Sequence, residues 1–168
     1  GLRLAAEPGT IFTYGDHNLA VAGQVVEDVG GEPLPRYMTE HIFAPLGMAD
    51  TDLLRSARVE ARLATGYVLR SSGARAVIDR QWVATAAASI YSTPRDMARY
   101  LAALLGEGAN EHGRVLRPET VAMMFAPHYQ PDPRVPGQGL GFFRASLGDR
   151  PAVEHQGVLP GFTSRRSV

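Results

Sequence analysis

Apolar residues over positions 19–29 recur at helical spacing, and the pair Gly30-Gly31 follows them as a helix-ending signal. We therefore predict a helix over 19–29, with Asp16 or Asn18 capping its start. Apolar positions over 118–125 have the same spacing and predict another short helix.

Two further helices are predicted between these. One runs from about residue 35 and ends before Pro45, because proline cannot continue a helix. The other begins after Thr93, a good capping residue, and its apolar positions continue to residue 105. Asp96 stands where an acidic side chain can close the cap.

Strand-like runs are weaker in the middle of the chain and clearer at its end. Short strands are predicted over 64–69 and 76–78 around a Ser-Ser-Gly turn, followed by an alanine-rich segment over 83–89. A proline- and glycine-rich loop over 127–139 precedes predicted strands at 140–147, 152–155 and 162–168. The pattern predicts an α+β protein, mostly helical over 1–126 and with an antiparallel sheet over 139–168.

Composition excludes several kinds of chemistry. Seventeen basic residues balance seventeen acidic ones, so no net charge attracts nucleic acid or an anionic membrane. No apolar run approaches the ~18 residues of a membrane span. Cysteine and lysine are both absent, which removes disulfides, thiol nucleophiles and lysine bases from these residues. We expect no metal and no cofactor.

Five segments, in order along the chain, together suggest a family. They are 8–16 (PGTIFTYGD), 42–51 (IFAPLGMADT), 87–98 (AASIYSTPRDMA), 116–120 (LRPET), and 139–142 (GLGF) with 155–157 (HQG) and 160–162 (PGF). This series resembles the serine hydrolases of the β-lactamase and penicillin-binding type. The resemblance is strongest to the class C-like branch, which also holds esterases and D-amino-acid peptidases.

The resemblance implies a β-lactamase/transpeptidase-like fold, of which residues 1–168 would be a part. The family takes its nucleophilic serine and a lysine from an S-x-x-K helix start upstream of the Y-x-N segment. Only thirteen residues precede Tyr14, and no G-x-S-x-G elbow replaces the missing pair. We expect the nucleophile segment and the C-terminal end of the domain to lie outside this sequence, and the chain alone to be inactive.

Tyr14 matches the family's tyrosine, which relays the serine proton and later protonates the leaving group. Asp16 stands where the family usually has asparagine, and a carboxylate can only accept hydrogen bonds where an amide also donates. Asp16 therefore either alters substrate recognition or simply caps the helix. An isolated tyrosine is normally a packing residue.

His155 and Gly157 match the H-x-G variant of the family's K-T-G motif. By that resemblance His155 would orient substrate or assist Tyr14, and Gly157 would leave room for substrate beside the strand. The backbone N–H of Val158 would supply half of the oxyanion hole. The other four histidines are expected to be structural, and none has metal-ligand spacing to a carboxylate: His17, His41, His112 and His128. Trp82 and Tyr91 are expected to pack in the core.

Three functions follow from these patterns. The first is part of a serine hydrolase that acts on an amide, ester or β-lactam through an acyl-enzyme, with a small molecule or peptide as substrate. The second is a non-catalytic relative that binds peptides or peptidoglycan. The third is an unrelated structural domain, which would leave Tyr14 and His155 far apart. The parent protein could be exported or associated with the cell envelope, and an open sheet edge favours a homo-oligomer.

Overall fold

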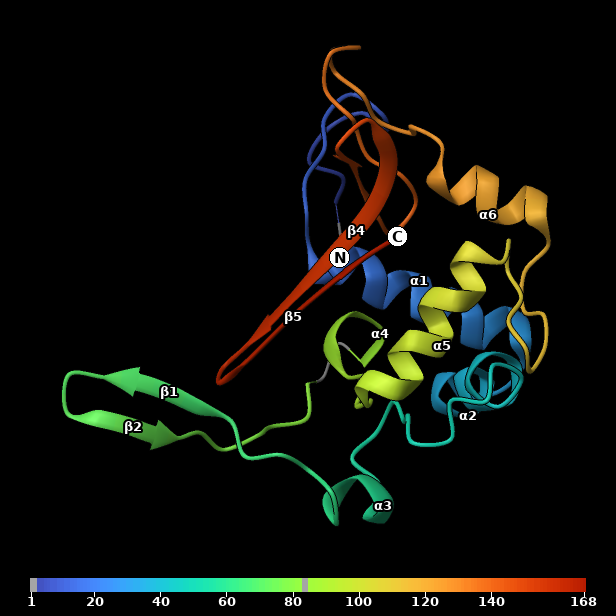
Figure 1. Cartoon of the computed structure of the whole chain (residues 1–168). Coiled ribbons are helices and arrows are strands. Elements are labelled where there is room, and N and C mark those ends of the chain that lie inside the picture. Colours follow the sequence, from blue (N-terminus) through green and yellow to red (C-terminus); the bar gives the residue numbers. More distant parts are fainter. Residues whose placement is uncertain (1–2, 83–84) are drawn as a thin grey trace.

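The computed structural model describes residues 3–82 and 85–168 (Figure 1). Its elements in chain order are α1 (Asp16–Gly30), α2 (Leu34–Met38), the π-helix η1 (Thr39–Phe43), α3 (Ala57–Glu60), β1 (Tyr67–Arg70), β2 (Gly73–Ala76), α4 (Thr85–Ala88), α5 (Pro94–Leu105), α6 (Pro118–Phe125), β3 (Phe143–Leu147), β4 (Arg150–Leu159) and β5 (Phe162–Ser167). Part of the alanine-rich segment, residues 83 and 84, lies outside the described residues.

The predicted first helix is confirmed as α1, but its start differs from the prediction. The cap residue is Gly15, and no side chain bonds the free N–H groups there. Asp16 already lies in the first turn, one position past the cap, so the predicted caps Asp16 and Asn18 are wrong. At the other end Gly31 takes a left-handed conformation with φ of 71°, which glycine adopts without steric cost.

The second predicted helix is confirmed as α2 followed directly by η1. The N–H of Ala44 donates to the carbonyl of Thr39 at 2.9 Å, a wider turn than that of an α-helix. Pro45 follows and has no N–H with which to continue the ladder. The short helix α3 was not predicted.

Helix α5 joins the two parts of the core. Its cap is confirmed, because Thr93 Oγ1 accepts from the backbone N–H of Asp96 at 3.2 Å. Ala103 belongs to one buried cluster and the adjacent Leu104 to another. The first cluster also contains Phe43, Leu46 and Met48, and the second contains Phe142 and Val153. One helix thus ties the region after η1 to the C-terminal sheet.

The two sheets are both antiparallel. β1 and β2 form a hairpin that projects from the helices (Figure 1), with Tyr67 opposite Ala76 and Arg70 opposite Gly73. The second strand of this hairpin therefore begins earlier than predicted, because only two residues make the turn. The other sheet has the order β3-β4-β5.

The C-terminal sheet confirms the three predicted strands with changed limits. β3 begins at residue 143 rather than 140, because Leu140 N–H bonds to the carbonyl of Met124 at 2.8 Å and holds the preceding residues in a turn. β4 is longer than predicted. The turn after β4 rests on the base of the β1–β2 hairpin, since a Cβ placed on Gly161 would lie 2.7 Å from Tyr67 N.

The longest described helix, α1, has 15 residues, fewer than the ~20 that a bilayer requires, and none of the helices over 3–82 and 85–168 is both long and apolar enough to span one.

Candidate active site

Tyr14 and His155, which lie at opposite ends of the sequence, come together in the structure. Their ring centroids are 6.0 Å apart, and the planes are tilted by 45°. Phe143 at the start of β3 contacts both rings, at 6.2 Å from Tyr14 and 5.6 Å from His155. The unrelated structural domain, which would have kept Tyr14 and His155 apart, is contradicted.

Tyr14 is reachable from solvent, with 56% of its surface exposed. It lies in the extended segment just before α1, and so the start of that helix positions it. Asp16 is exposed in the first turn of α1, and no hydrogen bond or ion pair of its carboxylate is seen among the described residues. A carboxylate there is favoured by the positive end of the helix dipole.

The register of β4 decides which of its groups face the site. Val153 and Val168 exchange two backbone hydrogen bonds, of 2.8 and 3.0 Å. Hydrogen-bonded and non-hydrogen-bonded pairs alternate along antiparallel strands. The odd-numbered residues of β4 therefore direct their N–H and C=O groups toward β5, and the even-numbered residues direct theirs away from β5. Side chains alternate in the same way, so His155 and Gly157 share the face on which Val153 is buried.

Among the strands of the described residues, none pairs with the backbone of Val158 on the side away from β5. β3 begins at Phe143, which lies opposite Glu154, so β3 does not extend to positions 156 and 158. By the alternation above, the N–H groups of Gln156 and Val158 point toward that open side. An N–H in such a place can donate to a ligand, as an oxyanion hole requires. The Val158 side chain is on the opposite face from His155.

The space above Gly157 is partly occupied. Gly157 lies opposite Ser164, and a Cβ added to Gly157 would come 2.7 Å from Ser164 Oγ. The glycine therefore makes room for a hydroxyl of the neighbouring strand, in addition to any room for substrate.

His155 is held by its own chain. Its Nδ1 lies 2.6 Å from the carbonyl oxygen of Gln156, one of the backbone groups that point to the open side of β4. Phe143 and Tyr14 contact the ring from other directions. The imidazole thus has a defined orientation beside Tyr14.

Arg166 is a neighbour of this site that motif comparison missed. It lies directly opposite His155 on β5 and so shares its face. Its Nε is buried and has no hydrogen-bond partner among the described residues. Burial raises the pKa of Tyr100 on α5, and the nearby Arg166 opposes that shift. Counting back from the Pro160-Gly161 turn would have paired Arg166 with His155 from sequence alone.

Asp96 does not close the cap of α5, contrary to the prediction. Its carboxylate is fully buried and accepts hydrogen bonds from Asp50 N at 2.7 Å, Thr51 Oγ1 at 2.9 Å and Arg99 Nη1 at 3.0 Å. Arg99 also donates to the carbonyl of Gly47 at 2.7 Å. Two of the family-like segments, 42–51 and 87–98, therefore meet at a polar hub with a structural role.

Trp82 and Tyr91 were both expected to pack in the core, and Trp82 does not, because 44% of its surface is exposed. Tyr91 is partly buried and donates from its hydroxyl to Asp79 Oδ2 at 2.8 Å. Burial, with Asp79 beside it, raises the pKa of Tyr91 to about 12. Arg55 Nη1 bonds to the backbone carbonyl of Asp79 at 3.1 Å. This cluster fixes the segment that leads out of the β1–β2 hairpin.

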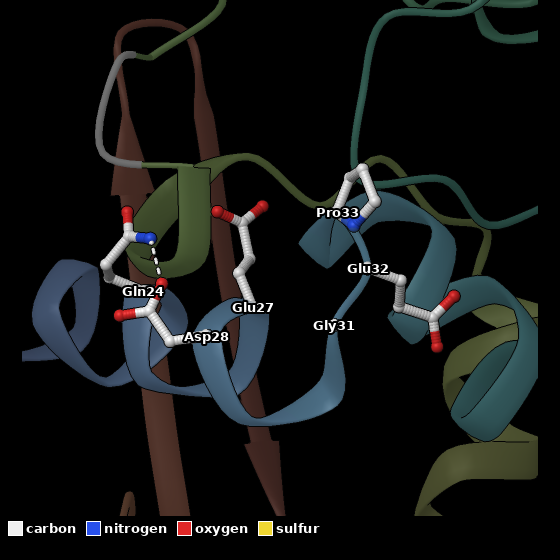
Figure 2. A pocket seen from close by; sticks show the side chains of 6 residues that line it. All are labelled: Gln24, Glu27, Asp28, Gly31, Glu32 and Pro33. Atoms are coloured by element: carbon white, nitrogen blue, oxygen red, sulfur yellow. Dashed lines mark hydrogen bonds between the residues drawn. The ribbon is translucent and has the colours of Figure 1, made fainter.

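An acidic pocket lies away from Tyr14 and His155, at the end of α1 (Figure 2). Its polar groups are engaged: Gln24 Nε2 donates to Asp28 at 2.9 Å, and Glu27 accepts from Leu34 N at 2.6 Å. Glu32 pairs with Arg36 at 3.2 Å and with His41 at 2.9 Å.

The expectation that none of the other histidines has metal-ligand spacing to a carboxylate is wrong for His41, whose ring nitrogen and the carboxylate oxygens of Glu32 and Glu40 lie within 4.8 Å of one another. His112 lies 3.4 Å from Glu111, but it belongs to no such cluster of three groups among the described residues. Arg36 bonds both carboxylates of the first cluster and so supplies their counter-charge.

Comparison with known proteins decides the family. A family profile described as Beta-lactamase matches residues 1–167. The chain belongs to the beta-lactamase family. Similar proteins include a D-amino acid amidase, a lovastatin esterase and a monacolin J acid methylbutanoyltransferase. Protein Rv1367c of Mycobacterium tuberculosis is 33% identical over 131 residues, which cover 73% of this chain and 32% of that protein.

Solved structures agree on the fold. The octameric penicillin-binding protein homologue from Pyrococcus abyssi superposes with a TM-score of 0.82 and 23% identity, covering 98% of this chain and 37% of that one. D-amino acid amidase from Ochrobactrum anthropi gives a TM-score of 0.69 with 28% identity over 94% of this chain and 48% of that one. The predicted fold is confirmed, and the chain spans about a third of the length of the curated relatives it matches.

Proposed function

We propose that this chain forms part of a β-lactamase-related serine hydrolase, which cleaves an amide, ester or β-lactam bond through an acyl-enzyme. The observation that carries the proposal is the meeting of Tyr14 and His155 beside the open edge of β4. Acyl transfer needs a proton carrier and N–H donors near one reacting atom, and this wall of the site offers both.

Each residue has a role in the proposal. Tyr14 carries the proton from the nucleophile and returns it to the leaving group. The N–H of Val158 stabilises the negative charge that develops on the carbonyl oxygen. Asp16 lies at the substrate side of α1, where it accepts hydrogen bonds, and Gly157 keeps the strand open to substrate. The serine and its lysine are not among the 168 residues, so a longer parent protein would supply them.

Acyl-enzyme formation in the parent protein tests the proposal. The parent should be labelled covalently by a fluorescent β-lactam or a fluorophosphonate, and should release p-nitrophenol from esters with a burst. Tyr14→Phe should lower turnover by about 10²–10⁴-fold, the usual contribution of a proton-transfer group. Tyr67→Phe is the matched control, since both tyrosines are 56% exposed and Tyr67 lies in the hairpin. Equal losses in the two variants would contradict the role of Tyr14.

The non-catalytic alternative rests on Asp16 in place of asparagine and on the absence of the S-x-x-K nucleophile from these 168 residues. Under this alternative the parent would bind D-alanyl peptides or peptidoglycan fragments without being labelled. Binding by calorimetry with no burst would favour it over the hydrolase, and labelling of the serine would reject it.

A homo-oligomer is a further part of the proposal. In the described residues β5 is an outer strand of its sheet, and an unpaired edge favours strand addition. The Pyrococcus abyssi homologue is octameric. Light scattering of the parent protein tests this, and a single monomeric species at high concentration would contradict it.

A further inference from the structure

The hydrogen bond of His155 restricts where its proton can be. A backbone carbonyl oxygen can only accept, so the Nδ1 that lies 2.6 Å from Gln156 O must carry the hydrogen. In the neutral ring the other nitrogen, Nε2, then holds a lone pair. No hydrogen bond of Nε2 is seen among residues 3–82 and 85–168.

The register of the sheet explains why this carbonyl is available. Gln156 is an even residue of β4, so its backbone oxygen points away from β5. β3 begins opposite Glu154 and does not reach it. Had β3 continued for two more residues, its N–H would have occupied this oxygen and left His155 Nδ1 without that partner.

We propose that the Gln156 carbonyl fixes His155 as the Nδ1–H tautomer, so that Nε2 serves as a proton acceptor for Tyr14. This rests on the proposed function and deepens it, because it makes His155 a base where the sequence resemblance left orientation or donation open. Gln156 is then a positioning residue that acts through its backbone.

The proton balance of the step is simple. As the nucleophile's O–H bond breaks and its oxygen bonds the substrate carbonyl carbon, Tyr14 oxygen takes that proton. The Tyr14 O–H bond breaks in turn and an Nε2–H bond forms, which leaves an imidazolium. Collapse of the intermediate reverses both transfers and delivers one proton to the leaving group. The lone pair of a neutral imidazole nitrogen is a better proton acceptor than the oxygen of a neutral phenol, so the relay ends on His155.

The tautomer can be measured without any activity. Long-range ¹H–¹⁵N spectra of the ¹⁵N-histidine-labelled protein, assigned with His155→Gln, should show a protonated Nδ1 and an unprotonated Nε2 above pH 8. The pattern should persist in Tyr14→Phe, because the carbonyl and not the phenol sets it. A protonated Nε2, or a tautomer that changes in Tyr14→Phe, would overturn the proposal.

A pair of variants tests the acceptor in the parent protein. Asn and Gln can each form hydrogen bonds, but neither amide can take up a proton. His155→Asn and His155→Gln should therefore both lower kcat by about 10²–10⁴-fold, the usual contribution of a proton-transfer group, with similar KM. A kcat within about tenfold of that of the unsubstituted protein in either variant would overturn the acceptor role. If the parent showed no turnover, the proposed function would fail, and the spectra would still decide the tautomer.

Discussion

Two polar groups of residues in this chain are built in opposite ways. Around Asp96 a fully buried carboxylate accepts three hydrogen bonds, two from the distant residues Asp50 and Thr51 and one from Arg99 on its own helix. Around Tyr14 and His155 the side chains contact one another through their rings and leave the phenol exposed. Buried polar groups are costly unless they are satisfied, so the first arrangement locks the fold.

The second arrangement leaves bonding capacity unused. The N–H of Val158 faces an open strand edge, Asp16 is exposed, and Nε2 of His155 is unengaged in the described structure. Such groups contribute little to folding and remain available to a ligand. The contrast teaches that family-like segments serve two purposes here, since 42–51 and 87–98 build the scaffold and the segments around Tyr14 and His155 form the candidate site.

Replacing Asp96 should have the largest effect on stability. Asp96→Ala removes the acceptor of the Asp50 N–H and leaves the Thr51 hydroxyl with Ser92 Oγ alone, at 2.8 Å. We expect a loss of about 3–5 kcal/mol in the free energy of unfolding. Urea denaturation followed by circular dichroism measures it. Asp149→Ala in the exposed β3–β4 turn is the control, with an expected change within about 0.5 kcal/mol. Similar losses in both variants would mean that the hub does not lock the fold.

The next largest effect on stability is expected in the buried apolar cluster of Phe43, Leu46, Met48 and Ala103. Leu46→Ala removes a fully buried side chain from the cluster shared with Phe43 and Ala103, and should cost about 2–5 kcal/mol. The exposed Leu147→Ala should change stability by less than about 0.5 kcal/mol. Thermal unfolding compares the stability of the two variants. A small effect of Leu46→Ala would show that this apolar cluster is loosely packed.

Tyr91 offers a smaller and pH-dependent effect. Tyr91→Phe loses the hydrogen bond to Asp79 and should cost about 1 kcal/mol. Because folding raises the pKa of Tyr91 from 10 to about 12, its contribution is complete below pH 10 and is lost as the pH rises toward 12. Urea midpoints across this range should fall less steeply in Tyr91→Phe than in Tyr67→Phe, and parallel slopes would contradict the assignment.

The smallest effect on stability is expected at the candidate site. Tyr14→Phe should alter the free energy of unfolding by less than about 0.5 kcal/mol, because the side chain is largely exposed. The same variant should carry the large loss of turnover in the parent protein. Differential scanning calorimetry beside the kinetic assay tests both, and a destabilised Tyr14→Phe would place this tyrosine among the scaffold residues.

Local signals in the sequence predicted the longer helices but missed the four-residue helices α3 and α4. Apolar spacing located α1, α5 and α6, and Thr93 was identified as a cap from residue type alone. The limits of the strands were predicted less accurately. The start of β3 depends on the backbone hydrogen bond from Leu140 N–H to Met124 O, which no local pattern encodes. The burial of Asp96 was missed for a similar reason, since its partners Asp50 and Thr51 lie 46 and 45 residues away.

The residues of the candidate site were predicted from the family resemblance of motifs that lie far apart in the sequence. Hydrophobic spacing alone could not have predicted that these motifs lie close together. Tyr14 and His155 lie at opposite ends of the sequence and come together only in the tertiary structure. The tautomer of His155 depends on where β3 begins, which is a tertiary property. Arg166 was within reach of sequence reasoning, because a tight turn after Leu159 fixes the pairing of the two strands.

The alternation along β4 limits how this segment can change length during evolution. Deleting one residue between Val153 and His155 would turn the imidazole to the opposite face and direct the Val158 N–H at β5. The tip of the β1–β2 hairpin at Ser71 and Ser72 is exposed, and a change in its length would not alter the direction of any group at the candidate site. Among homologous chains, gaps and insertions should therefore accumulate at that tip, while β4 keeps a constant number of residues.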